Sequence, residues 1–141
     1  MANPAQYLPS AAYKKAGILV VRHSLPGTSA ATAANYGVFF IAPYKCKVLR
    51  IQERHRTLGT DGGAVTLNVE KVPSGTAEGG GTAIATAVSL KATVDTNQTY
   101  TLSTTEASTE LAAGDALALT DAGTLTAVAD VTVTVELAPI P

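Results

Sequence analysis

Val131-Thr132-Val133-Thr134-Val135-Glu136-Leu137 alternates apolar and polar residues near the end of the chain. Successive side chains of a β-strand point to opposite faces of the sheet, so this stretch predicts a strand with valine and leucine on one face. Val65-Thr66-Leu67-Asn68-Val69-Glu70 repeats the same alternation. Both segments therefore predict sheets that bury one face against a core.

Further short apolar segments lie between turn residues on either side of these two. They occupy residues 17–23, 36–42, 45–58, 84–90, 97–103, 116–120 and 125–128, and residues 106–110 predict a single helical turn. About eight short strands, with turn signals roughly every ten residues, predict an all-β domain over residues 17–141. The expected architecture is a jelly-roll-like antiparallel β-sandwich.

The turn Thr60-Asp61-Gly62-Gly63 separates two of the predicted strands, residues 45–58 and 64–72. Its glycines permit positive φ angles, and a short glycine-containing turn between two strands is typical of a hairpin. We therefore expect these two strands to pair with each other.

The composition fits one domain with an unusual core and surface. A chain of 141 residues buries roughly two thirds of the surface of its unfolded form. It has no Trp and two Phe, so small branched side chains must fill the core. Charged residues make up 15% of the chain, against about 25% in ordinary globular domains. We therefore expect neighbouring subunits to cover part of the surface.

The charges are unevenly distributed along the chain. Residues 1–56 contain eight of the ten Lys and Arg residues, and after Lys91 there are seven acids and no basic residue. In a closed sandwich the two halves interleave, so one interpretation is that their charges cancel in space. The other is a polarised particle whose basic and acidic patches meet across subunits.

Residues 1–16 differ from the rest of the sequence. Pro4 and Pro9 disfavour a helix, and the apolar residues show no periodicity. One interpretation is a disordered tail. The other is an extended arm that orders on a partner. The partner contacts would come from tyrosine and leucine anchors and two lysines, namely Tyr7, Leu8, Tyr13, Lys14 and Lys15.

Residues 50–56 (RIQERHR) are the densest group of candidate binding residues. Period two places Arg50, Arg54 and Arg56 on one face, where three guanidinium groups repel one another unless something acidic lies opposite. This face predicts a subunit or partner interface, with a solvated face and nucleic-acid contact as alternatives. No aromatic residue interleaves with the arginines, so we expect no nucleic-acid partner. Glu53 and His55 share the other face and predict an internal ion pair or an interface hydrogen bond.

Nothing in the sequence predicts a catalytic, cofactor or metal site, and we expect the protein not to be an enzyme. Two histidines and Cys46 do not form a zinc motif, and Cys46 in an apolar strand predicts a small buried side chain. The glycine runs lack the residues of a phosphate-binding loop. No apolar stretch reaches the about 18 residues that cross a membrane. The first residues do not resemble a secretory signal, so we expect synthesis in the cytosol.

Several segments resemble a recurring pattern of tailed-bacteriophage virion proteins. They are Tyr36-Gly-Val-Phe-Phe-Ile-Ala-Pro43 with the residues up to Val48, Asp61–Lys71 with the following glycine-rich loop, Leu111-Ala-Ala-Gly-Asp-Ala-Leu-Ala-Leu119, Gly123–Ala127 and Val131–Leu137. Over residues 36–137 the chain is similar to small head proteins of the capsid decoration or cement type.

This resemblance implies a jelly-roll-like sandwich, often trimeric, on the exterior of the capsid in the virion. The implied partners are the major capsid protein and further copies of the chain, and the implied role is to clamp neighbouring capsid subunits. A head-fibre, tail or other minor virion protein, or a non-catalytic carbohydrate-binding module, is the alternative.

Overall fold

A computed structural model describes residues 17–28 and 37–141 of the chain. The predicted arm, residues 1–16, lies outside these described residues. The elements in chain order are β1 (Leu19–Thr28), β2 (Val38–Ile41), β3 (Cys46–Arg54), β4 (Thr66–Val72), β5 (Thr82–Ala83), β6 (Val88–Ser89), β7 (Gln98–Thr99), α2 (Glu106–Thr109), β8 (Glu110–Leu111), β9 (Ala116–Ala122) and β10 (Ala129–Pro139).

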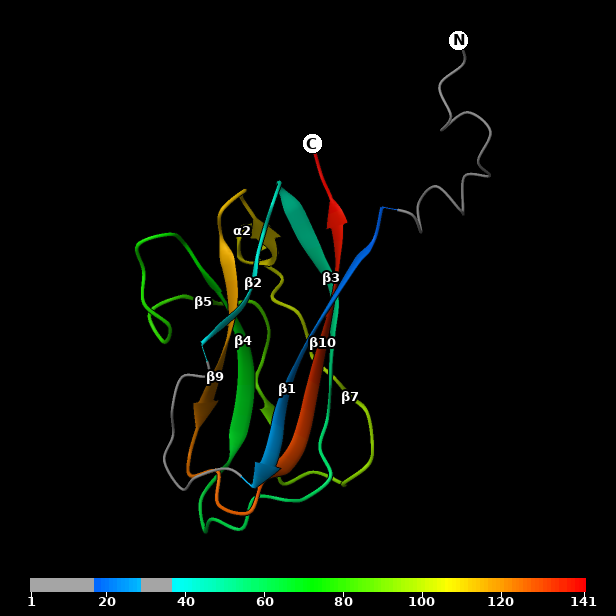
Figure 1. Ribbon diagram of the computed structural model, residues 1–141, viewed down its shortest axis with the longest axis vertical. Helices are drawn as coiled ribbons and strands as arrows, with labels where there is room; N and C mark the ends of the chain where they lie inside the picture. Colours follow the sequence, from blue (N-terminus) through cyan, green and yellow to red (C-terminus); the bar gives the residue numbers. More distant parts are fainter. Residues whose placement is uncertain (1–16, 29–36) are drawn as a thin grey trace, which may run out of the picture.

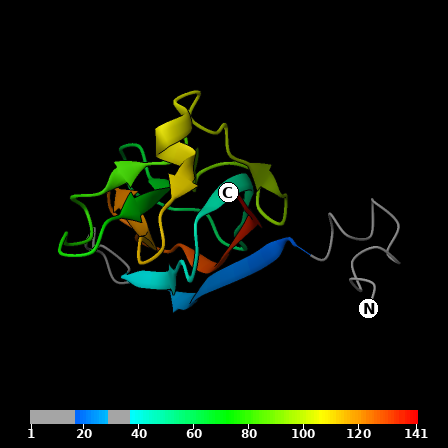
Figure 2. The same cartoon turned by 90° about the horizontal axis from the view of Figure 1, so that it is seen from above.

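The strands form two antiparallel sheets that pack face to face as a sandwich (Figures 1 and 2). The first sheet has the order β1-β10-β3-β7, with β8 also on β3, and the second has the order β2-β9-β4-β5, with β6 also on β4. Most successive strands therefore alternate between the sheets. Because β5 and β6 share one strand position, and β7 and β8 another, the topology is that of an eight-position jelly roll. The predicted fold class is confirmed.

β10 occupies the centre of the first sheet because both of its edges are paired. It pairs with β1 on one side and with β3 on the other. Its inward residues Val131, Val133, Val135 and Leu137 are at most 1% exposed, and burying each such side chain contributes about 1.5–3 kcal/mol. They pack with inward residues of the second sheet, so the alternation read from the sequence defines the inner face.

The predicted hairpin between residues 45–58 and 64–72 is wrong. β3 lies in the first sheet, whereas β4 lies in the second and pairs with β9, β5 and β6. The connecting segment crosses from one sheet to the other, and Gly59 within it donates a hydrogen bond to the carbonyl of Leu90. Turn residues determine where a chain bends, but they do not determine which sheet receives the next strand.

Other boundaries shifted where pairing is short. The predicted strand 84–90 contains only β6, and 97–103 contains only β7. The predicted helical turn is confirmed as α2, and the first strand continues to Thr28. No helix among the described residues is long and apolar enough to cross a membrane.

A candidate docking face on the first sheet

The outward side chains of the first sheet form one continuous polar surface, which we call the arginine face. Antiparallel register places Arg22 beside Thr134 and Thr134 beside Gln52, and in the next row places Val20 beside Glu136 and Glu136 beside Arg50. The face comprises Val20, Arg22 and Ser24 of β1, Thr132, Thr134 and Glu136 of β10, Arg50, Gln52 and Arg54 of β3, and Thr99 of β7.

Arg50 and Arg54 project from the same face of β3, as the alternation predicts, and each meets an acidic side chain. The Arg50 guanidinium lies 2.5 Å from the carboxylate of Glu136 on the neighbouring strand. Arg54 lies 3.7 Å from a carboxylate oxygen of Asp95. The acidic groups that offset the repulsion between the arginines therefore come from the same chain. Arg56 lies just beyond the end of β3.

Two more ion pairs join the basic and acidic halves of the sequence beside this face. Lys47 lies 2.8 Å from Glu106, and Lys45 lies 3.7 Å from Glu110. The hydrogen bond between Lys47 and Glu106 raises the pKa of the lysine and lowers that of the glutamate. With the pairs of Arg50 and Arg54, this is the cancellation of charge in space that the first interpretation of the sequence predicts.

Glu53 and His55 lie beneath the arginine face, inside the core, and the predicted internal pair is confirmed. Glu53 is 1% exposed and His55 is fully buried. The ring Nδ1 lies 2.9 Å from Glu53 Oε1, and the other carboxylate oxygen accepts a 2.7 Å hydrogen bond from the Gln98 amide. The ring Nε2 lies 3.1 Å from the carbonyl oxygen of Ala92.

His55 makes a polar contact through each of its two ring nitrogens. Both ring nitrogens of His55 face oxygen atoms, so the donor in each contact is set by where the protons lie. Burial raises the pKa of the Glu53 carboxyl, and hydrogen bonds from Gln98 and His55 partly oppose that effect. Burial also raises the pKa of the neighbouring Tyr100 hydroxyl. The arrangement ties β3 to the following loops.

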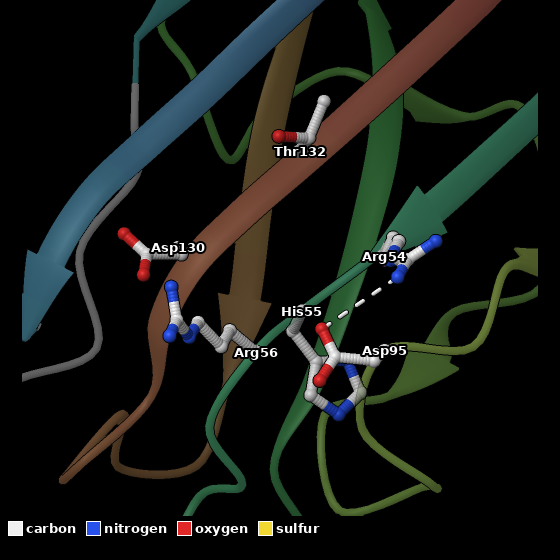
Figure 3. A pocket seen from close by; sticks show the side chains of 6 residues that line it. All are labelled: Arg54, His55, Arg56, Asp95, Asp130 and Thr132. Atoms are coloured by element: carbon white, nitrogen blue, oxygen red, sulfur yellow. Dashed lines mark ion pairs between the residues drawn. The ribbon is translucent and has the colours of Figure 1, made fainter.

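A pocket of about 440 Å³ opens at the end of the arginine face (Figure 3). Arg54 and Asp95 lie on one side of it, joined by their ion pair, and Arg56 and Asp130 lie on the other (Figure 3). Asp95 and Asp130 both have left-handed backbones, with φ of 56° and 53°. The pocket presents both signs of charge, so it can receive charged side chains of a partner. It is lined by Arg54, His55, Arg56, Asp95, Asp130 and Thr132.

The structure brings Arg50, Arg54 and Arg56 to one surface, whereas Tyr7, Leu8, Tyr13, Lys14 and Lys15 lie outside the described residues. Sequence reasoning missed the apolar part of this surface. Val20 on β1 is 65% exposed, and Leu49, which adjoins this face at the register irregularity beside Arg50 of β3, is 44% exposed. Val20 occupies an outward position of β1, which the alternation of side chains along a strand could have indicated. The neighbouring residues are apolar too, so the sequence shows no alternation there.

No family model and no curated protein matches the chain. Among solved structures, a chain of the cyanophage Pam1 capsid asymmetric unit is similar with a TM-score of 0.59 and 19% identity, covering 87% of this chain and 85% of that one. A chain from disulfide-linked pili of Bacillus endospore appendages has a TM-score of 0.41 and 16% identity, covering 88% of this chain and 89% of that one. At this identity, the first similarity shows a shared fold.

Proposed function

We propose that this protein is a non-catalytic structural component of a tailed-phage virion, and specifically a cement protein on the outer surface of the capsid. The observation that carries the proposal is the jelly-roll fold, shared over most of both chains with a chain of the cyanophage Pam1 capsid asymmetric unit. The motifs of residues 36–137 support the same assignment independently of the fold comparison.

The arginine face supplies a surface suited to repeated contact. Its outward residues are largely threonine, glutamine and ion-paired arginine, and Val20 and Leu49 add exposed apolar area. The ion pairs of Arg50 and Arg54 and the short serine and threonine side chains lower the desolvation and entropy costs of covering such a face. At one end, the pocket beside Arg56 and Asp130 offers charged groups for alignment with the major capsid protein.

The mechanism is linkage between binding and lattice stability. A protein that binds the expanded capsid and not its disrupted form stabilises the expanded form by mass action. Many copies, each with a modest interface, add their contributions around the symmetric shell. Residues 1–16 would extend the contact to a neighbouring capsid subunit, and further copies of the chain would complete a homo-oligomer.

The proposal is tested by adding the purified protein to expanded heads that lack it. We expect co-sedimentation at hundreds of copies per head and a higher temperature of head disruption. Equal disruption temperatures with and without bound protein would contradict the cement role. A copy number of a dozen or fewer would instead indicate a fibre, tail or vertex component, and binding to glycans but not to heads would indicate a carbohydrate-binding module.

Variants locate the contact. Arg56→Glu should weaken head binding because it reverses the charge at the pocket, whereas Ser74→Glu adds an acid to an exposed loop after β4 of the other sheet and should leave binding unchanged. Deletion of residues 1–15 should lower occupancy on heads without changing the unfolding temperature of the domain. Full occupancy of the deletion variant would show that the arm does not contact the capsid.

A further inference from the structure

β1 is a long strand with one unpaired side. It pairs with β10 along eight register positions, and no other described strand pairs with it. Figure 2 shows β1 along the margin of the sandwich. An edge of this kind presents backbone N–H and C=O groups that another strand can pair with.

The two halves of this edge differ. The second half contains Pro26 and an irregular register between Leu25 and Thr28, and both features discourage further pairing. The first half, residues 19–24, has unbroken register and no proline. Its outward residue Val20 is 65% exposed, among the most exposed large apolar residues of the described chain. This half therefore combines backbone groups that no described strand pairs with and an exposed apolar side chain.

Arg22 supplies a charge that the same edge leaves unmatched. The described residues provide no acidic group within 4.0 Å of it, unlike Arg50 and Arg54, which both have carboxylate partners. Glu136 lies one strand away from Val20 in the row next to Arg22. A cation that arrived opposite Val20 would therefore come close to this carboxylate.

We propose that β1 is a self-association edge, at which residues 19–24 of two copies pair antiparallel about a two-fold axis. The contact would join the first sheets of both copies into one continuous sheet. It goes beyond the proposed virion role and does not depend on it. A two-fold contact also differs from the three-fold assembly that the family resemblance implies.

Charge selects the register of this contact. Placing Arg22 opposite Arg22 of the second copy sets like charges side by side, which destabilises a strand pair. Placing Val20 opposite Val20 of the second copy shortens the overlap between the strands. It also leaves Arg22 near Ala138 of the second copy, where the register offers no acidic residue. Placing Val21 opposite Val21 of the second copy sets Val20 of each copy opposite Arg22 of the other copy.

In that register Arg22 of each copy lies opposite Val20 of the other copy. The backbone of Arg22 is then two strands, or about 10 Å, from the backbone of Glu136 in that other copy. A long arginine side chain can cover the valine with its aliphatic part and direct its guanidinium towards the carboxylate. Glu136 already faces Arg50, so the association would create a network of two arginines around one glutamate in each copy. The exposed valine and the unmatched arginine are then explained by the same contact.

Sedimentation equilibrium of the isolated full chain tests the proposal. We expect a monomer–dimer equilibrium, and Val20→Lys should weaken it at least tenfold. Ile41→Lys is the matched control, because Ile41 is 63% exposed but lies on β2 in the other sheet. A monomer at all concentrations, a trimer, or an equal response of both variants would overturn the proposal.

Disulfide cross-linking tests the register without relying on a destabilising change. A Val20→Cys chain mixed with an Arg22→Cys chain should oxidise to a heterodimer faster than either chain forms a homodimer, because the two positions face each other only across the contact. The native Cys46 is fully buried and does not compete. Equal rates in all three samples would contradict the register. If the wild-type chain forms the dimer but does not bind heads, that result would count against the virion role alone.

Discussion

Replacing His55 by alanine would leave the Glu53 carboxyl group in the core with the Gln98 amide as its remaining side-chain partner. Breaking a buried ion pair by removing one partner costs about 3–5 kcal/mol, because the other charge remains desolvated. The exposed pair of Arg50 and Glu136 lies only a few residues away and is half exposed on the arginine side. A surface pair of this kind is worth about 0–1 kcal/mol.

A loss of 3–5 kcal/mol is a large share of the about 5–15 kcal/mol that keeps a domain folded. For a domain of this size it corresponds to a fall of roughly 10–20 °C in the unfolding temperature. Urea unfolding of His55→Ala, Glu53→Ala and the double variant separates the interaction from the cavities that the single changes create. A parallel cycle on Arg50 and Glu136 provides the exposed reference.

We expect a coupling energy of a few kcal/mol between Glu53 and His55 and less than about 1 kcal/mol between Arg50 and Glu136. We also expect Glu53→Met combined with His55→Leu to be closer to the wild type than either alanine variant, because no charge then remains buried. Equal coupling in the two cycles would refute the reasoning that burial makes the inner pair stronger.

Three further predictions follow from single residues. Burial raises the pKa of the Glu53 carboxyl from its ordinary 4.5. Between these two pKa values the folded state retains a proton that the unfolded chain loses. The free energy of unfolding should therefore fall as the pH rises from 4.5 through the raised pKa. Glu53→Gln should flatten this part of the pH profile in urea unfolding; parallel profiles would contradict it. Gly123→Ala should destabilise strongly because its Cβ would clash with the Ala64 carbonyl, whereas Gly114→Ala, with a similar positive φ but open space, should cost about 1 kcal/mol. Equal losses in thermal unfolding would rule this out. Cys46 is fully buried and its pKa is raised, so a thiol reagent should label it only in denaturant; rapid labelling of the folded protein would show otherwise.

Several features of the fold were predictable because their signals are local. The alternation in residues 131–137 predicts both the β10 strand and its buried face, and the apolar setting of Cys46 predicts its burial. The shared phase of Glu53 and His55 predicts that they point the same way. In each case the backbone geometry of one strand suffices, since side chains two residues apart lie on one face.

The partners of the arginines were not predictable. Arg50 meets Glu136, 86 positions away, and Arg54 meets Asp95 from a loop after β6. The wrong hairpin has the same origin, because nothing local distinguishes a turn that returns along one sheet from a segment that crosses to the other. The exposure of Val20 also depends on β1 being an edge strand, which is a property of the assembled sheet.

By itself, the sequence determined the long strands, which of their faces is apolar and that two such faces must pack together, whereas the predicted strand at residues 125–128 is a turn. Only the tertiary structure decided that β10 lies between β1 and β3, which places Ser24 and Thr132, 108 positions apart, within 3.4 Å. Alternation is a property of neighbouring residues, whereas strand order results from closing long loops so that both sheets bury their apolar faces at once. That closure neutralises Arg50 and Arg54 and leaves one edge of β1 unpaired among the described strands.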